Sequence, residues 1–283
     1  MKKYENENLA ALIDKAVAGD RDSLETVILS VRDLIFNLSL RMLGTFHDAE
    51  DATQDIILKI ITHLSSFKKE SSFSTWAFRI AVNHLTDYKK HMFARYPLTF
   101  EFYGDDIENA PVGDIPDLTQ DVEKAILAEE LKLSCTNVML QCLDTDSRLI
   151  FVLGTMFKAD SRMAGDILGI TPEAYRQRLS RIRRKMADFL SAYCGEYGGG
   201  KCRCKDRLNY AIQSRRLNPS QLDYTAVSEA SAEKALDFKS AMEEIDDLSG
   251  YFSFSKLYES PERIKQFLEE FLESTSLSIV TNP

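Results

Sequence analysis

The chain has 283 residues, of which 44% are hydrophobic and 28% charged, and it carries a net charge of −9. No apolar run approaches the ~20 residues that span a bilayer, and the N-terminal residues lack the apolar stretch of a signal peptide, so we expect a cytoplasmic protein without membrane insertion. The five cysteines are an odd number, which argues against a disulfide framework and favours reduced thiols.

Residues 8–95 show helical hydrophobic spacing almost without a break and predict four helices. The first helix ends near Gly19, and the second continues to Gly44, a residue type that commonly stops helices. The third helix opens with acidic side chains in its first turn, where they complement the positive end of the helix dipole. The fourth helix begins near Ser72 or Ser74, either of which can cap it.

The composition changes after the fourth helix. Between residues 96 and 123 there are eight Asp and Glu and no Lys or Arg. Three prolines break any regular structure in this stretch: Pro97, Pro111 and Pro116. We therefore expect a flexible acidic linker over residues 96–121.

Helical periodicity resumes at residue 122 and continues to Tyr193, and no segment up to there alternates convincingly as a strand. We therefore expect an all-α chain. Residues 160–186 have the pattern of a helix-turn-helix, in which Gly169 makes the turn and Ile170 fills the angle between the helices. The side chains expected to face inward are Met163, Ala164, Ile167, Leu168, Ala174, Leu179 and Ile182.

The second helix of this motif is strongly basic on one face. Thr171 can cap it and Pro172 suits its first position. From 172 to 188 there are six basic side chains against two acidic ones, and a DNA major groove admits such a helix. A solvated basic helix in a bundle is the alternative. The residues expected to face outward are Arg176, Gln177, Ser180, Arg181 and Arg184.

Residues 71–91 hold the only tryptophan and form a helix with one face of mixed character. That face carries Phe73, Trp76, Ala77, Ile80, Asn83, His84 and Asp87. Aromatic rings stack on unpaired bases and asparagine can bond a base edge, while Lys89, Lys90 and Arg95 can hold phosphates. The alternative is that the aromatic residues belong to the core and that the polar ones form a surface pair.

The C-terminal extension contains a group of cysteines around three consecutive glycines. Cys194, Cys202 and Cys204 are three potential zinc ligands, and a fourth could come from Cys135, Cys142 or a histidine. Zinc binding, redox sensing and simple reduced thiols stay open as alternatives. We expect no required cofactor.

The extension is also acidic. From 221 to 283 there are 13 Asp and Glu against 5 Lys and Arg. Its last clear helix begins at Ser260, Pro261 and Glu262, with the serine as cap and the proline at the first position. We hypothesise that this negative charge screens the basic helix of the helix-turn-helix until a partner displaces it.

Four stretches together resemble the bacterial RNA polymerase sigma factors of the extracytoplasmic-function (ECF, group IV) type. Residues 16–44 resemble the first conserved helices of the family, and "HDAEDATQDIILKI" resembles its polymerase-binding helix. "FSTWAFRIAVNHLTD" resembles the segment that melts and reads the −10 promoter element. Residues 143–186 resemble the domain that reads the −35 element.

The resemblance implies a role for three sets of residues. Contacts to polymerase are implied for Asp48, Glu50, Asp51, Gln54 and Asp55. Contacts to the −10 element are implied for Trp76, Arg79, Asn83, Asp87, Lys89 and Lys90. Contacts to the −35 element are implied for Thr171, Arg176, Gln177, Ser180, Arg181 and Arg184.

The pattern and the resemblance together predict two small helical domains joined by the acidic linker and followed by a mostly helical extension. Residues 1–95 form the first domain, 96–121 the linker, 122–193 the helix-turn-helix domain and 194–283 the extension. The implied function is to direct core RNA polymerase to specific promoters and to assist −10 melting. The implied partners are core RNA polymerase, promoter DNA and, as a further candidate, an anti-sigma factor.

Two other classes stay open on the sequence. A stand-alone helix-turn-helix regulator would bind duplex DNA tightly without polymerase, and a cysteine-based metal- or redox-responsive regulator would depend on the thiol group. The sequence has no phosphate loop, nucleophile elbow or zinc-protease motif, so we expect no enzyme.

Overall fold

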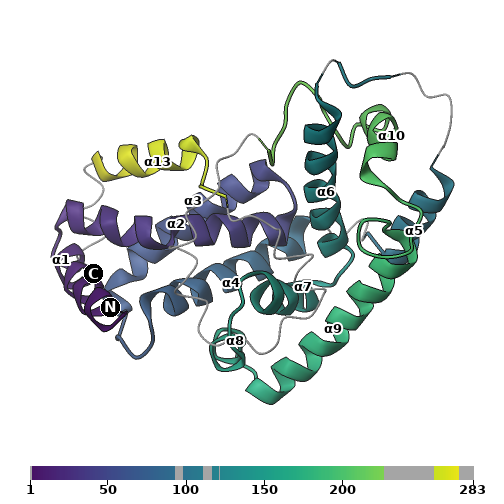
Figure 1. The fold of residues 1–283 in the computed structure, drawn as a ribbon. Helices are drawn as coiled ribbons and strands as arrows, with labels where there is room; N and C mark the ends of the chain where they lie inside the picture. The colour runs from purple at the N-terminus through teal and green to yellow at the C-terminus, as the bar shows by residue number, and fades with distance from the viewer. Residues whose placement is uncertain (1, 93–97, 111–116, 121, 226–257, 274–283) are drawn as a thin grey trace.

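The computed structural model describes residues 2–92, 98–110, 117–120, 122–225 and 258–273, with side chains described except at 2–7 and 88–92. The all-α prediction is confirmed, and no strand occurs in these ranges (Figure 1). The α-helices are α1 Lys2–Val17, α2 Arg21–Leu43, α3 Phe46–His63, α4 Phe73–Met92, α5 Phe100–Asn109, α6 Lys124–Gln141, α7 Thr145–Phe151, α8 Ser161–Leu168, α9 Pro172–Tyr193, α10 Leu208–Gln213 and α13 Glu262–Glu273. Short 3-10 turns at Leu64–Ser66 and Cys204–Arg207 and a π turn at Val152–Met156 complete them.

Helix α2 forms the centre of the first helical module, with α1, α3 and α4 packed around it. Asp20 caps its start, accepting a hydrogen bond from the backbone N–H of Ser23 at 3.0 Å. Gly44 ends it with φ 89°, a left-handed conformation that glycine adopts without steric cost. Its side chains Ile28 and Ile35 are fully buried, so the module closes around an aliphatic core.

The second module consists of α6–α9, and a glycine sets how closely its helices approach. The π turn after α7 contains Gly154, and a Cβ built there would lie 2.6 Å from Tyr175 Oη of α9. The missing side chain therefore lets α9 pack directly on the turn. Tyr175 is 1% exposed and donates to the backbone oxygen of Ile150 at 3.3 Å, whereas Ala174, which we had expected to face inward, is only half-buried.

The two modules pack directly against each other, with α4 lying along α8 (Figure 1). The rings of Phe78 on α4 and Phe157 after α7 meet edge to face with centroids 5.5 Å apart. Both side chains belong to one continuous hydrophobic core that runs through both modules. The described arrangement is therefore closed, with the predicted −10 helix against the helix-turn-helix.

Arg148 of α7 holds this junction together. Its side chain is 1% exposed, and its guanidinium donates five hydrogen bonds. Four acceptors are backbone oxygens, of Met42 at the end of α2 and of Leu140, Gln141 and Leu143 at the end of α6. Burial lowers the pKa of Arg148 to about 9, so the group stays charged at neutral pH. The cation thus faces the negative ends of two helix dipoles.

The acidic linker contains a helix, which the prolines had led us not to expect. Helix α5 starts after Thr99, whose hydroxyl accepts from the backbone N–H of Phe102 at 3.1 Å, and it lies between Pro97 and Pro111. Its Tyr103 ring stacks on Phe189 of α9 at 5.6 Å. The prolines therefore bound the helix instead of preventing it, and packing on α9 stabilises it.

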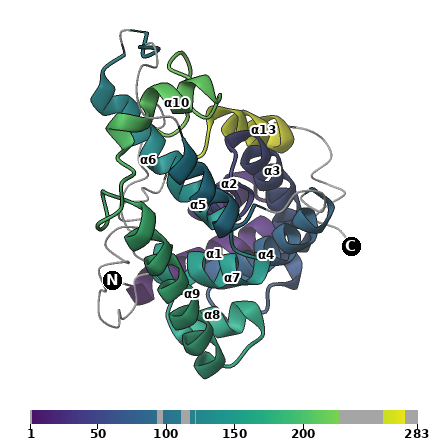
Figure 2. The ribbon, with the colours of Figure 1, turned by 90° about the vertical axis from the view of Figure 1, so that its right-hand side faces the viewer.

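The extension returns to both modules through buried polar contacts. Glu130 of α6 is 4% exposed and accepts from the backbone N–H groups of residues 223–225 at 2.8–3.1 Å. Asn37 of α2 bonds the backbone N–H and C=O of Tyr258 at 2.9 and 2.7 Å. Figure 2 shows α13, which follows these contacts, alongside α2 and α3.

Ser260, which the sequence predicts as the cap of the last helix, contacts α2. Its backbone N–H and its hydroxyl both donate to Asp33 Oδ1, at 3.1 and 2.9 Å. Asp33 also accepts from Arg32 at 3.0 Å. The buried carboxylate therefore uses the serine as a donor, and this contact fixes where α13 begins.

Arg148→Met should lower the free energy of unfolding by about 3 kcal/mol or more, because it leaves several buried carbonyl oxygens without donors. Urea denaturation followed by circular dichroism measures this. Arg178→Met, at an exposed arginine of α9, is the control and should change stability by less than about 0.5 kcal/mol. Equal effects in both variants would contradict a structural role of Arg148.

Candidate polymerase and nucleic-acid interfaces

Helix α3 presents a row of acidic and amide side chains on the side opposite its core face. Thr45 caps the helix, accepting from the backbone N–H of Asp48 at 3.2 Å. Ala49, Ala52 and Ile56 are fully buried against α2 and neighbouring helices, and they fix the rotation of α3. The row contains Asp48, Glu50, Asp51 and Gln54, which are half-buried, and Asp55, which is exposed.

The C-terminal helix α13 contacts this row, which the sequence did not predict. Arg263 Nη1 lies 3.5 Å from Glu50 Oε2 and 3.4 Å from Asp51 Oδ1. Ile264, Leu268 and Leu272 on the same helix are buried, on the side that faces α2 and α3. Helix α13 therefore packs its apolar stripe on α2 and α3 and brings one cation against the acidic row.

Helix α4 carries an aromatic cluster at its start. Ser72 is the cap, since its hydroxyl accepts from the backbone N–H of Thr75 at 3.2 Å. Trp76 is half-buried, with its ring 5.4 Å from Phe67 and stacked on Phe73 at 5.7 Å. The indole thus packs against two other rings, while part of its surface stays accessible.

The polar half of α4 divides into contacted and exposed positions. Arg79 Nε donates to the backbone oxygen of Asp166 in α8 at 3.2 Å, so this predicted −10 residue bridges the modules. Asn83 and Asp87 are exposed. Two predicted −10 residues, Lys89 and Lys90, fall within α4, but their side chains lie outside the described residues.

His84 connects the α4 surface to the acidic row, a link that sequence reasoning did not identify. Its Nδ1 lies 2.8 Å from Lys59 Nζ, and its Nε2 lies 3.8 Å from Asp55 Oδ2. Burial, together with the nearby Lys59, lowers the pKa of His84. The only sequence signal was the position of His84 on the polar half of the α4 stripe. Its contacts place the acidic row and the polar end of α4 side by side.

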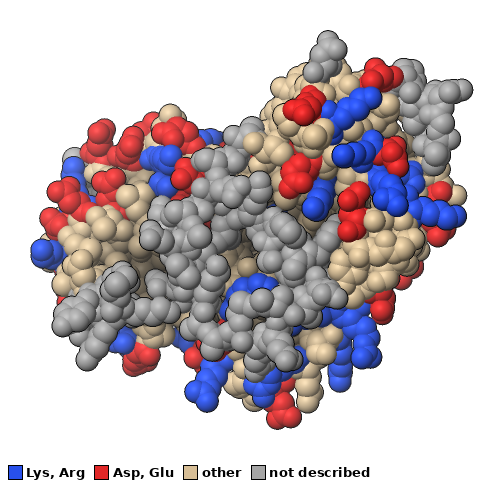
Figure 3. All heavy atoms as spheres, in the orientation of Figure 1, with Lys and Arg blue, Asp and Glu red and all other residues tan. Residues whose placement is uncertain are grey.

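Helix α9 begins as the helix-turn-helix pattern predicts. Gly169 has φ 67° at the turn, and the Thr171 hydroxyl accepts from the backbone N–H of Ala174 at 3.2 Å. Arg176 donates to the Ser161 hydroxyl of α8 at 2.9 Å. Lys and Arg side chains gather along the lower edge of the molecule, where α9 runs (Figure 3). The structure exposes all six predicted −35 residues: Thr171, Arg176, Gln177, Ser180, Arg181 and Arg184.

The described part of the extension does not screen this basic face. Helix α13 packs on α2 and α3, and α10 packs on α6. Residues 226–257, which carry much of the negative charge, lie outside the described residues. The screening hypothesis therefore has no support from the described contacts.

The thiol group does not have the arrangement of a metal centre. The cysteines form no disulfide, and Cys194 pairs with Cys202 through an isolated backbone bridge. Within the described residues, no three His, Cys, Asp or Glu side chains come together as a group that could hold a metal ion. Burial raises the pKa of Cys135 and of Cys204 to about 12, which keeps both thiols protonated. Zinc binding by Cys194, Cys202 and Cys204 stays a prediction.

Comparison with known proteins places this geometry in a family. The family model for sigma-70 region 2 matches residues 27–91, which extend from α2 into α4. The chain is 28% identical over 183 residues to the ECF RNA polymerase sigma factor SigW of Bacillus subtilis, covering 63% of this chain and 94% of that protein. It is 30% identical over 148 residues to the RNA polymerase sigma factor NccH of Alcaligenes xylosoxydans xylosoxydans, covering 51% and 74%. A solved structure of CnrH in complex with the cytosolic domain of CnrY shares 22% identity at a TM-score of 0.46, covering 64% of this chain and 95% of that one.

Fold and surfaces define a helical transcription factor with a helix-turn-helix and a second, aromatic helix beside an acidic one. The chain belongs to the ECF family of RNA polymerase sigma factors. Its function is to direct RNA polymerase in transcription initiation. Among the described helices, none is long and apolar enough to cross a membrane.

The buried thiols should resist alkylation in the folded protein. Iodoacetamide at pH 8 should modify Cys135 and Cys204 more than ~100-fold more slowly in the native chain than in urea, because the thiolate is the nucleophile and its fraction falls tenfold per pKa unit. Peptide mass spectrometry measures the rates site by site.

The same raised pKa values predict that the stability of the fold decreases at high pH. The folded thiols keep their protons above the unfolded pKa of about 8.5, so their contribution to stability is complete below that pH and is lost as the pH rises toward 12. Native labelling of Cys135 at the unfolded rate would contradict this burial.

Proposed function

We propose that the acidic row of α3 binds core RNA polymerase and that the polar end of α4 contacts the opened −10 strand. The observation that carries the proposal is that both surfaces lie within the region-2 match and meet at His84 of α4, whose Nδ1 lies 2.8 Å from Lys59 Nζ of α3. Negative side chains in a row can steer and orient binding to a basic partner. Asn83 and the accessible part of Trp76 offer hydrogen bonding and stacking to unpaired bases.

We assign the exposed face of α9 to the −35 element. A capped helix with Thr171, Arg176 and Gln177 near its start has its early side chains available for base edges, and the later arginines for phosphates. The extension contacts this helix at its far end, where the Cys202 N–H donates to the backbone oxygen of Tyr193 at 3.0 Å, whereas α10 and α13 pack on other helices. This face is therefore ready for duplex DNA without rearrangement.

Promoter engagement in this proposal requires the two modules to separate. Arg79 is bonded to the backbone oxygen of Asp166 in α8, and Phe78 is packed on Phe157. A nucleic-acid strand therefore cannot lie along the whole of α4 in the closed arrangement. Polymerase binding would stabilise the separated arrangement, since a partner shifts an equilibrium toward the state it binds better.

The proposal includes no catalytic activity of the chain itself and places it in the cytoplasm, where polymerase acts. An anti-sigma factor is a further candidate partner. The solved structures with similar folds include CnrH with the cytosolic domain of CnrY and RpoE with the anti-sigma factor NepR. A stand-alone helix-turn-helix regulator remains the competing function, and it differs in needing no polymerase.

Run-off transcription with core polymerase and genomic promoter fragments tests the function. Wild-type chain should give promoter-dependent transcripts, and Arg181→Ala should weaken promoter use about tenfold by removing one basic contact. Arg178→Ala removes the same charge from the flank of α9 and is the matched control. Tight, specific duplex binding without polymerase and no transcripts with it would instead establish the stand-alone regulator.

Displacing α13 should strengthen polymerase binding, because α13 and polymerase would compete for the acidic row. Leu268→Glu places a charge in the buried stripe, and Gln266→Glu adds the same charge at an exposed position of the same helix. The affinity of the Leu268 variant for core polymerase, measured by fluorescence anisotropy, should rise at least about tenfold, equivalent to ~1.4 kcal/mol. Unchanged affinity in a folded Leu268 variant would show that α13 does not compete.

A further inference from the structure

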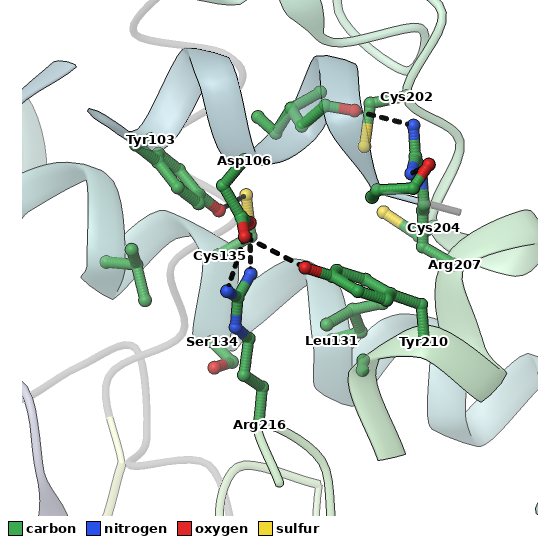
Figure 4. A pocket seen from close by; sticks show the side chains of 14 residues that line it. Tyr103, Asp106, Leu131, Ser134, Cys135, Cys202, Cys204, Arg207, Tyr210 and Arg216 are labelled. Carbon is green, nitrogen blue, oxygen red and sulfur yellow. Dashed lines mark hydrogen bonds and ion pairs between the residues drawn. The ribbon is translucent and has the colours of Figure 1, made fainter. Parts of the chain in front are cut away.

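A cavity of about 230 Å³ lies between α5, α6 and the start of the extension (Figure 4). Its apolar wall is formed by Ile107 from α5, Leu131 and Val138 from α6, and Ala211 from α10. It is separate from α3, α4 and α9, which carry the proposed polymerase and promoter contacts. A concave, mainly apolar wall with a few polar groups is the usual form of a small-molecule site.

One side of the cavity carries more positive than negative charge. Arg216 pairs with Asp106, with its Nη2 2.7 Å from Oδ1, and Tyr210 donates to the same oxygen at 2.9 Å. Arg207 also lines the cavity, and its guanidinium donates to two backbone carbonyl oxygens near the end of α5, at 2.8 and 3.2 Å. The wall thus carries two guanidinium groups and one carboxylate, and an anionic group entering the cavity would balance the remaining positive charge.

The remaining wall consists of thiols that behave as apolar surface. Cys135, Cys202 and Cys204 line the cavity from α6 and from the extension. A buried cysteine side chain packs as a small, weakly polar group. The thiol wall therefore offers apolar contact to an organic body.

We propose that this cavity binds a small organic anion with a flat or compact apolar body. Its anionic group would face Arg207 and Arg216, and its body would lie between α6 and α10 against the thiols. Such a shape follows the general form of ligand sites, in which apolar walls bury the ligand and a few polar groups orient it. The bound molecule would join the linker helix, the second module and the extension, and would stabilise their packing by mass action.

Isothermal titration calorimetry on the full chain tests the proposal with 2-naphthoate and its neutral counterpart 2-naphthamide. The carboxylate should bind at one site, at least about tenfold more tightly than the amide, because only the carboxylate pairs with the guanidinium groups. Arg207→Met should remove this preference, and Arg207→Lys should retain part of it because it keeps the charge. Melting curves without ligand verify that each variant is folded.

A cavity-filling substitution locates the site. Ala211→Trp should reduce naphthoate affinity by more than about tenfold, because the indole occupies the space of the ligand. Ile126→Trp adds the same ring at an exposed position of α6 outside the cavity and should bind as wild type. Should the Ala211 variant fail to fold, the Arg207 pair still decides the charge preference.

Three results would overturn the proposal. One is no saturable binding of either compound up to ~1 mM, the weak limit of specific ligands. The second is equal affinity for the acid and the amide in the wild-type chain. The third is stoichiometric zinc in the purified chain, released by a thiol-blocking mercurial, which would make the cavity thiols metal ligands. None of these outcomes bears on transcription by the run-off assay, so the two proposals fail independently.

Discussion

The closed arrangement of this protein depends on one buried cation, Arg148. A guanidinium taken out of water needs nearly all of its donors satisfied, and here backbone oxygens at the ends of α2 and α6 supply most of the acceptors. Those oxygens are the groups that a helix terminus leaves unpaired. The donors of Arg148 and these unpaired oxygens satisfy each other. The end of α2 and the end of α6 are therefore held in a fixed position relative to each other. The start of α3 directly follows this junction, and the position of its acidic row is set by it.

The extension is attached by the same kind of contact, repeated at two sites. Glu130 accepts several backbone N–H groups from residues 223–225, and Asn37 pairs with both backbone groups of Tyr258. Hydrogen bonds to backbone groups require alignment, whereas apolar contacts tolerate sliding. These polar contacts therefore set the register of the extension. They bring α13 onto α2 and α3 with Arg263 beside Glu50 and Asp51.

The three surfaces to which we assign polymerase and promoter contacts consequently differ in availability. The basic face of α9 is open, α4 is engaged with α8 through Arg79, and the acidic row of α3 is partly covered by α13. These differences in exposure fit the function of a sigma factor. The surfaces that we propose act only within the polymerase complex are the ones occupied by intramolecular contacts, which polymerase binding would have to replace.

The sequence by itself determined most of the described helices and several of their caps, and it proposed the residues of each surface. Local signals are sufficient for these features: Gly44 and Gly169 take left-handed conformations, Thr171 caps α9, and the hydrophobic period separates Arg181 from the core. The linker helix escaped prediction because its stability comes from packing on Phe189, which lies about 85 residues further along the chain. Only the tertiary structure decided that Arg148 is buried and bonds the ends of α2 and α6, and that Ser260 donates to Asp33. It also decided that Tyr175 is buried and that α13 packs on α3. Each of these contacts joins residues that are far apart in the sequence. A sequence pattern shows the chemistry of a side chain, but it does not show which distant residue that side chain contacts.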